Sequence, residues 1–288
     1  MKYAYIEIAN TCNLNCSFCP YSQKEHFPSW MSVELFSKII DDIKNHVEEI
    51  YLHVLGEPLL HPNLNIFLEI AKKAHLCVNI TTNGTLIKKN HQLLLESTVV
   101  RQINFSVHAL EEWNNQEKAL SALNDMLLFA QEAAEKRPDL YINFRLWNIQ
   151  KENSSHWNRL VSSQLESTFH CDLSSHDFSI RHKSFPLQNR IYLHFDTRFE
   201  WPDGKQEGLS TKGTCKALDS HIGILCDGRV VACCLDHNGN LELGKLPKQT
   251  LSSILSSPRA VAMKQGFKEK KLVEPFCQSC GFCKRFKV

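Results

Sequence analysis

The most constraining feature of this 288-residue sequence is the regular alternation of short apolar segments with amphipathic ones over its first two-thirds. Segment 33–46 shows the helical spacing, with apolar residues at Leu35, Phe36, Ile39, Ile40 and Ile43, and Ser32 is expected as its N-cap. We expect further helices at 62–75, 86–96, 110–136 and 154–164, and strands at 3–9, 49–54, 77–81, 99–107, 140–146 and 190–195. This alternation predicts an α/β fold with a parallel sheet, open or closed into part of a barrel.

The pattern changes in the last third of the chain. Residues 196–213 are polar and rich in Gly, Pro and charge, as in a linker. Beyond them, apolar segments 222–225 and 229–232 flank Asp227-Gly228, which predicts a hairpin with a type I′ turn, and 250–264 is expected to be a helix. We therefore expect a large α/β domain over 1–200, a linker over 201–213 and a small cysteine-rich α+β domain over 214–288.

Composition excludes several classes of protein. With 43% hydrophobic and 22% charged residues, the chain is neither disordered nor of low complexity. Its formal net charge of +2 favours neither nucleic acid nor a membrane surface as a partner. No apolar run reaches the roughly 18 residues that span a bilayer, and Glu7 stands where a signal peptide needs apolar residues. We expect a cytoplasmic protein.

Twelve cysteines without an export signal indicate metal or cluster chemistry rather than a disulfide framework. Cys12, Cys16 and Cys19 follow the first predicted strand with C-x3-C-x2-C spacing. Three thiolates so close together can hold three irons of a [4Fe–4S] cluster and leave the fourth iron open. Structural zinc is the alternative, but it needs four protein ligands and no fourth Cys or His follows nearby. Cys77 and Cys171 stand alone and are interpreted as structural.

The first motif, with Phe18 before its last cysteine, resembles the C-x3-C-x-aromatic-C motif of the radical S-adenosylmethionine (SAM) superfamily. The resemblance implies a partial (β/α)6 TIM-like barrel. It also implies that the open iron of a [4Fe–4S] cluster binds SAM, which is reductively cleaved to methionine and a 5′-deoxyadenosyl radical that abstracts hydrogen from substrate. A low-potential donor such as flavodoxin or ferredoxin would supply the electron.

Polar residues follow the later strands at the ends where barrel active sites form. Gly56-Glu57-Pro58 is similar to the family's Gly-Gly-Glu-Pro motif, with Leu55 in place of the first Gly, and implies that Glu57 holds the SAM amino group. The resemblance assigns further cofactor contacts to Phe18, Gly56, Pro58, Thr82, Asn83, Ser106, His108, Arg145 and Asn148, with Arg145 facing the SAM carboxylate. Each of these has an ordinary alternative as a turn, a loop or a solvated charge. Glu7, His53 and His61 also lie near strand ends and are interpreted as structural.

The C-terminal cysteines have the spacing of a zinc ribbon or of a second iron–sulfur cluster. The Asp-Gly hairpin and the closing C-x2-C resemble the SPASM/Twitch extension of radical SAM enzymes. This resemblance implies Cys215, Cys233, Cys277 and Cys280 as ligands, with Cys226, Cys234 and Cys283 as alternates. No cysteine lies between Cys234 and Cys277, so we expect one auxiliary [4Fe–4S] cluster rather than two.

An auxiliary cluster near the radical site can accept an electron, so the expected reaction is an oxidation or dehydrogenation. Redox-neutral chemistry such as epimerisation, peptide modification and a non-enzymatic iron–sulfur protein remain alternatives. The chain starts at the first barrel strand, which favours a small molecule or a peptide recognised by the barrel itself. No residue is singled out as the group that takes the substrate proton.

Overall fold

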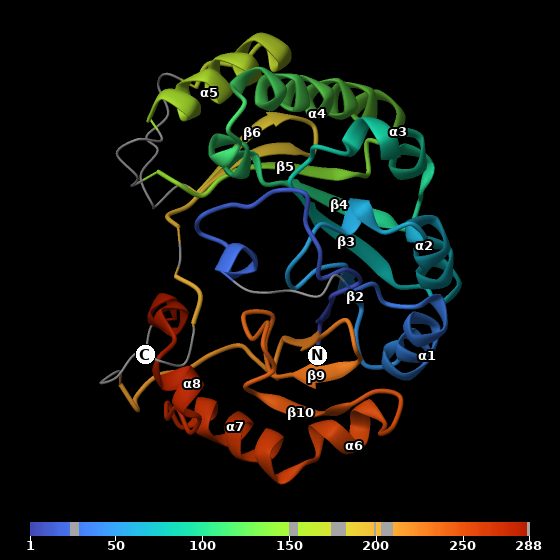
Figure 1. Ribbon diagram of the computed structural model, residues 1–288, viewed down its shortest axis with the longest axis vertical. Helices are drawn as coiled ribbons and strands as arrows, with labels where there is room; N and C mark the ends of the chain where they lie inside the picture. The colour runs from blue at the N-terminus through green and yellow to red at the C-terminus, as the bar shows by residue number, and fades with distance from the viewer. Residues whose placement is uncertain (24–28, 150–154, 174–182, 199, 203–209, 287–288) are drawn as a thin grey trace. The chain divides into compact units, whose positions relative to one another are not determined.

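The computed structural model describes residues 1–23, 29–149, 155–173, 183–198, 200–202 and 210–286 (Figure 1). The chain forms two compact units. The first comprises residues 1–12, 18–78 and 199–288, and the second comprises residues 13–17 and 79–198. This division does not test the predicted domain boundaries at 200 and 213, which stay predictions, and residues 203–209 of the expected linker lie outside the described part of the chain.

The first unit contains parallel strands with an antiparallel extension. Its strand order is β10-β9-β8-β1-β2, and β1 is parallel to both β2 and β8. The strands are β1 (Tyr3–Ile6), β2 (Glu49–Tyr51), β8 (His221–Ile224), β9 (Arg229–Val231) and β10 (Glu242–Lys245), and β3 (Cys77–Thr82) begins here. The helices are α1 (Val33–Ile43), α2 (Leu64–Lys73), α6 (Leu251–Leu255), α7 (Pro258–Lys268) and α8 (Pro275–Gln278), with 3-10 turns η1 (Pro20–Gln23), η2 (Pro58–Leu60) and η5 (Gly281–Arg285).

The core of the first unit follows from the apolar face of α1. The Ser32 hydroxyl accepts a hydrogen bond from the Leu35 N–H at 3.1 Å, so the predicted N-cap is confirmed. The helix buries Phe36, and the Phe36 ring stacks on Phe67 of α2 with 4.2 Å between ring centroids. Aromatic stacking thus joins the first two helices.

The second unit continues the same alternation. Its strand order is β3-β4-β5-β7-β6, with β4, β5 and β7 mutually parallel and β6 antiparallel to β7. Its elements are β4 (Val100–Phe105), β5 (Tyr141–Leu146), β6 (Ser184–Gln188), β7 (Ile191–Phe195), α3 (Ile87–Glu96), η3 (Val107–Glu112), α4 (Gln116–Lys136) and α5 (Ser155–Phe169). Phe105, Phe129 and Phe144 pack together in its core.

Helix boundaries differ from the sequence prediction in several places, among them α1, which ends at Ile43 rather than at residue 46, and α5, which continues to Phe169 rather than ending at residue 164. The predicted helix 110–136 is the 3-10 turn η3 followed by α4, because the Asn115 side chain caps a new helix by accepting from the Lys118 N–H at 2.8 Å. The predicted helix 250–264 breaks into α6 and α7 at Pro258, which takes the first helical position. Helix α2 begins at Leu64 rather than at residue 62.

Two strands were not predicted. Strand β6 contains Pro186 and lies at an edge, where a residue without an N–H is tolerated. Strand β10 is short, and its pairing with β9 is irregular between Glu242 and Gly244. Both segments lack the apolar alternation by which a strand is recognised in a sequence.

The hairpin between β8 and β9 is confirmed, but its turn is not the predicted type I′. Leu225 and Arg229 close a three-residue loop through an N–H to carbonyl bond of 2.8 Å. Gly228 has a φ of +86°, whereas Asp227 is not among the residues with positive φ. This is the three-residue hairpin that ends in a left-handed glycine. The loop residues are Cys226, Asp227 and Gly228, and the Cys226 N–H donates to the Glu7 carboxylate at 3.2 Å.

The parallel pairing of β8 with β1 places the first hairpin strand of the predicted C-terminal domain beside the first strand of the chain.

Within the described residues, no helix is long and apolar enough to cross a membrane.

Candidate functional site

The loop after β2 is hydrogen-bonded to the segment that precedes Cys12. The Glu57 N–H donates to the Thr11 carbonyl at 2.8 Å. Gly56 has a φ of +76°, and a Cβ at this position would lie 2.2 Å from the Ala9 carbonyl oxygen. Only glycine permits this approach. The predicted SAM amino-group contact and the first predicted cluster ligand are therefore neighbours in space.

Glu57 is a buried carboxylate at the start of η2. It is 1% exposed, and one of its oxygens accepts a hydrogen bond from the Leu59 N–H at 3.0 Å. Pro58 occupies the first position of the turn, where its missing N–H costs nothing. The local sequence therefore holds the Glu57 side chain in one orientation. Its contact with SAM stays a prediction.

The C-x3-C-x2-C motif contributes to both units. Cys12, Phe18 and Cys19 are half-buried in the first unit, and burial raises the pKa of the Cys19 thiol. Cys16 is buried in the second unit, with its Sγ 3.8 Å from the Ala109 carbonyl oxygen. Their joint role as ligands of one cluster stays a prediction.

The Thr-Asn-Gly turn after β3 is built by its own side chains. The Thr82 hydroxyl accepts from the Gly84 N–H at 2.9 Å, and the Asn83 side-chain oxygen Oδ1 accepts from the Thr85 N–H at 3.0 Å. The Asn83 amide also donates to the Asn13 side chain at 2.9 Å. The turn is thereby joined to the cysteine motif, in which Asn13 directly follows Cys12. The predicted SAM contacts of Thr82 and Asn83 stay predictions.

The ends of β4 and β5 come together through His108 and Arg145. The His108 ring nitrogen Nδ1 lies 2.9 Å from the Arg145 carbonyl oxygen, and burial lowers the pKa of His108 to about 4, so the ring is neutral. The Arg145 guanidinium lies over the Trp147 ring, 4.8 Å from its centroid. Ser106, at the end of β4, donates its N–H to the Thr82 carbonyl at 2.8 Å.

Asn148 lies beyond β5 and is 1% exposed. Its amide donates to the Glu111 carboxylate at 2.9 Å, which joins the segment after β5 to η3. The structure thus brings the polar residues that follow β4 and β5 together within the second unit. Which of them contact SAM stays a prediction.

Sequence reasoning missed polar residues on the same face of the sheet as Arg145. His194 of β7 stands opposite Arg145 in the strand register, and burial, together with the Arg145 charge, lowers the pKa of His194 to about 4. Asn143, two residues before Arg145, donates its amide to the Asn104 side chain at 2.8 Å. The alternation of residues in β7 could have indicated this position of His194, because it places Tyr192 and His194 on the same face of the strand.

Six C-terminal cysteines surround one cavity of about 150 Å³ in the first unit. It contains all four predicted ligands and two of the three alternates: Cys215, Cys233, Cys234, Cys277, Cys280 and Cys283. Apolar and aromatic side chains, among them Leu241, Phe276 and Phe282, complete the wall. Within the described residues, no three Cys, His, Asp or Glu side chains are arranged to hold a single metal ion. Six thiols spread around an apolar wall suit a group larger than one ion, and the donor set fits an iron–sulfur cluster.

The thiols of this cavity are costly to ionise in the absence of a cluster. Burial, followed by the neighbouring thiols, raises the pKa of Cys277 well above its usual value and that of Cys234 to about 12. Iron binds thiolates, so a bound cluster would supply the positive charge that the apolar wall lacks.

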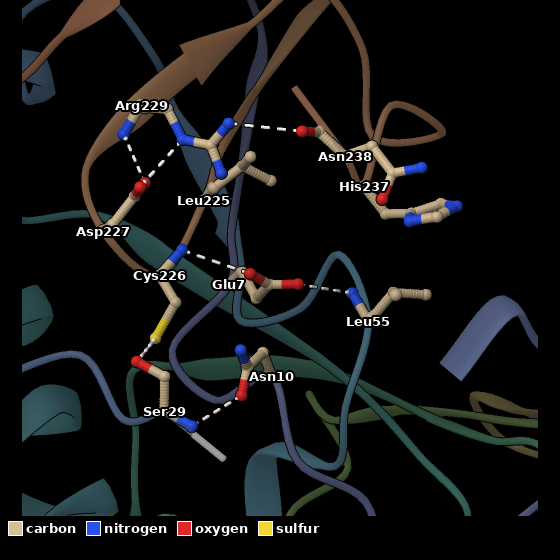
Figure 2. A pocket seen from close by; sticks show the side chains of 10 residues that line it. All are labelled: Glu7, Asn10, Ser29, Leu55, Leu225, Cys226, Asp227, Arg229, His237 and Asn238. Atoms are coloured by element: carbon tan, nitrogen blue, oxygen red, sulfur yellow. Dashed lines mark hydrogen bonds and ion pairs between the residues drawn. The ribbon is translucent and has the colours of Figure 1, made fainter. Parts of the chain in front are cut away.

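Cys226 lies apart from the other C-terminal cysteines, in a second pocket of about 230 Å³ (Figure 2). Its thiol lies 3.6 Å from the Ser29 hydroxyl oxygen and 3.9 Å from the Ile8 carbonyl oxygen. Burial raises its pKa to about 11. The structure therefore does not place this alternate at the cysteine cavity.

Glu7 is the central residue of the second pocket. It is 5% exposed, and its carboxylate accepts hydrogen bonds from the Leu55 and Cys226 N–H groups, each at 3.2 Å (Figure 2). Burial raises the pKa of Glu7 to about 7, although the two N–H groups favour the charged form. One buried carboxyl thus links the loop before Gly56 to the turn of the hairpin. These two hydrogen bonds agree with the interpretation of Glu7 as a structural residue.

Comparison with known families identifies both parts of the chain. Residues 6–120 match the family model of the radical SAM superfamily, and residues 215–281 match that of the SPASM iron–sulfur cluster-binding domain. The chain belongs to the radical SAM superfamily. Within it, this protein is one that carries a SPASM domain. The two domains imply a [4Fe–4S] cluster, SAM and auxiliary iron–sulfur ligation.

Curated relatives match only in part. The tungsten-containing aldehyde ferredoxin oxidoreductase cofactor-modifying protein of Pyrococcus furiosus is 35% identical over 117 residues, which is 40% of this chain and 33% of that protein. The antilisterial bacteriocin subtilosin biosynthesis protein AlbA of Bacillus subtilis is 30% identical over 95 residues, 33% of this chain and 21% of that protein. The chain thus spans a third or less of the length of these relatives.

Solved structures match nearly the whole chain. BtrN in complex with AdoMet and 2-DOIA has a TM-score of 0.63 at 16% identity, covering 98% of this chain and 93% of BtrN. SuiB of Streptococcus suis bound to S-adenosylmethionine has a TM-score of 0.62 at 16% identity, covering 98% and 71%. The anSMEcpe protein with bound AdoMet has a TM-score of 0.59 at 14% identity, covering 96% and 90%. These likenesses confirm the predicted fold, a partial TIM-like α/β barrel with a cysteine-rich C-terminal region.

Proposed function

We propose that this chain is an enzyme that oxidises a substrate C–H group, with an electron acceptor held in the cysteine cavity. When bound, the cluster and SAM supply a 5′-deoxyadenosyl radical that removes a hydrogen atom from the substrate. Completing the oxidation then requires the loss of one proton and one electron. The protein's part is to hold SAM, to position the substrate and to provide a place for that electron.

The observation that carries this proposal is the cysteine cavity. Its wall includes Tyr5 of β1, and the same strand leads to Cys12, seven residues further along the chain. Seven residues span at most about 25 Å even when fully extended. Tyr5, in the wall of the cavity, and Cys12, the first predicted cluster ligand, therefore lie within about 25 Å of each other in the first unit. We assign the ligands of the acceptor to Cys215, Cys233, Cys277 and Cys280, with Cys234 and Cys283 as alternates.

For SAM we assign Glu57 to the amino group and Arg145 to the carboxylate. Glu57 is held by its cap on Leu59, and Arg145 stacks on Trp147. A charged group that is already oriented loses little conformational entropy on binding, which increases the affinity it provides.

The substrate we propose is a small polar molecule or a peptide segment. BtrN was solved with 2-DOIA and anSMEcpe with a Cp18Cys peptide, so proteins of this fold accept both kinds. A low-potential carrier such as flavodoxin or ferredoxin is the proposed donor. The cytoplasmic location stays a prediction.

The test compares wild-type protein with the double variant Cys233→Ala/Cys280→Ala, both reconstituted with iron and sulfide and shown by circular dichroism to be folded. Incubation with cell extract, labelled SAM and reductant identifies the compound that transfers hydrogen. Oxidation predicts a product lighter by two hydrogen atoms, made by the wild type only, while both proteins form 5′-deoxyadenosine. A product of unchanged mass would favour redox-neutral chemistry. Failure of the wild type to cleave SAM would leave an iron–sulfur binding protein.

A further inference from the structure

A third cavity, larger than the cysteine cavity, also has Cys215 in its wall. Its volume is about 480 Å³, and four lysines stand in its wall: Lys216, Lys264, Lys268 and Lys270. Cys215 and Ala217 line both this cavity and the cysteine cavity. A proposed cluster ligand is therefore reached from a basic surface with no further layer of residues between.

The fold brings two distant segments together to make this surface. Gly213 donates its N–H to the Lys270 carbonyl at 2.9 Å, and Leu272 donates to the Thr211 carbonyl at 2.7 Å. The Thr214 hydroxyl donates to the Phe267 carbonyl at 2.9 Å. These bonds fix the segment before Cys215 to the end of α7 and to the residues that follow it.

The charge of the surface is strongly one-sided. Segments 211–219 and 264–271 carry six lysines and two acids, a balance of +4, whereas the whole chain has a net charge of +2. The rest of the molecule is therefore net negative. Lys268 and Lys270 are exposed, and the Lys216 ammonium pairs only distantly with Asp219, at 3.9 Å.

We propose that this lysine surface, formed by Lys212, Lys216, Lys264, Lys268, Lys270 and Lys271, is the docking site of an acidic one-electron carrier protein. The carrier would exchange a single electron with the group that Cys215 helps to hold. Transient redox complexes use small, polar, charged interfaces, which this surface provides. Complementary charge accelerates such encounters and makes them sensitive to salt.

The electron balance fits this role. Each substrate oxidation releases one electron beyond the hydrogen atom and the proton, and each reductive cleavage of SAM consumes one. An oxidised carrier docked at the lysine surface takes up the released electron and, once reduced, can supply the next cleavage. This inference rests on the proposed function for the identity of the group at Cys215, but the docking itself does not depend on it.

The test uses the reconstituted 288-residue chain and oxidised flavodoxin as the acidic probe. The dissociation constant is measured by isothermal titration calorimetry at low and at high salt for wild type, Lys268→Glu/Lys270→Glu and the control Lys72→Glu/Lys73→Glu. The control lysines are also exposed and lie in the last turn of α2, as Lys268 does in α7. We expect the test variant to bind at least tenfold more weakly at low salt, and the control to stay within twofold of wild type. The milder Lys268→Gln/Lys270→Gln should fall between wild type and the reversal.

Unchanged affinity in both Lys268/Lys270 variants, or an equal loss in the control, would overturn the docking site. A second readout is the rate of electron transfer to flavodoxin from photoreduced protein that carries Cys12→Ala/Cys16→Ala/Cys19→Ala. Adding the Lys268 and Lys270 substitutions to this protein should lower the rate in proportion to the loss of flavodoxin affinity. Iron analysis of this variant separates the two proposals. If it contains no iron while binding still depends on the lysines, the electron-acceptor function fails and the docking site stands.

Discussion

Single residues decide how the two ends of SAM would be held. Glu57 is buried with one oxygen committed to a cap, and Arg145 is braced against an aromatic ring. We propose that each side chain binds the SAM group of opposite charge. A charge-assisted hydrogen bond in such a place contributes about 1.5–3 kcal/mol.

We expect Glu57→Gln and Arg145→Met each to weaken SAM binding by about tenfold or more. The loss follows because each substitution removes a charge while leaving the fold in place. Equilibrium binding of SAM to the anaerobically reconstituted variants measures it, with iron content as the control for an intact cluster. SAM affinity equal to wild type in both variants would contradict this assignment.

Glu7 gives the protein a pH-dependent stability. Because burial raises its pKa in the folded state from the model-peptide value of 4.5 to about 7, the folded chain binds the proton more tightly than the unfolded chain. The resulting stabilisation is complete below about pH 4.5 and is lost as the pH rises through about 7. The Leu55 and Cys226 N–H groups reduce this loss without abolishing it.

Glu7→Gln should remove this dependence. Between about pH 5.5 and about pH 8, the unfolding free energy of wild type should fall by about 2 kcal/mol relative to the variant. Urea unfolding at the two pH values measures the difference, and Glu69→Gln on the exposed side of α2 should keep the wild-type profile. A difference between wild type and Glu7→Gln that stays constant with pH would disprove an ionising Glu7.

At the scale of elements, the close approach of the loop after β2 to the segment before Cys12 is the tightest constraint. Gly56 combines a positive φ with backbone atoms where a Cβ would stand. The left-handed conformation alone costs a non-glycine residue about 1–2 kcal/mol. Any side chain there must also push the loop, and Glu57 with it, away from Thr11.

We expect Gly56→Ala to lower the unfolding free energy by about 2 kcal/mol or more and to weaken SAM binding further than that loss explains. Gly281→Ala is the matched control, because its new Cβ would meet nothing within 4 Å and its φ is not positive. Urea unfolding and SAM titration report the two effects separately. Equal behaviour of the two variants would show that the loop tolerates displacement.

At the scale of the whole molecule, the two cysteine sets should load independently. We expect about eight irons per reconstituted chain, four for each cluster. Cys12→Ala/Cys16→Ala/Cys19→Ala should retain about half of the iron and form no 5′-deoxyadenosine. Iron and sulfide analysis with chromatography of SAM products measures both, and Cys77→Ala is the control. Zinc at the C-terminal site, with only four irons in total, would refute the auxiliary cluster.

Much of this protein could be predicted from its sequence because the relevant signals are local. Apolar periodicity identified α1 and its Ser32 cap, and the spacing of Cys12, Cys16 and Cys19 indicated an open cluster before any fold was known. Helix ends were less predictable where a side-chain cap competed with a continuous apolar pattern, as at Asn115, and a proline divided the last predicted helix. Strand β6 was missed because an edge strand needs no buried alternation.

Sequence alone determined the alternating fold, the cysteine motifs and the strand-end residues, because each depends on spacing along the chain. Only the tertiary structure decided which residues share a site across long separations. Cys226 stands among the C-terminal cysteines in the sequence. In the structure its N–H donates to the carboxylate of Glu7, 219 residues away, and both residues line a different pocket. The lysine surface likewise exists only because Gly213 and Leu272 join two segments that are far apart in the sequence. Burial and long-range hydrogen bonds bring such residues together. Contacts between distant segments leave no periodic pattern in the sequence, so they cannot be predicted from it.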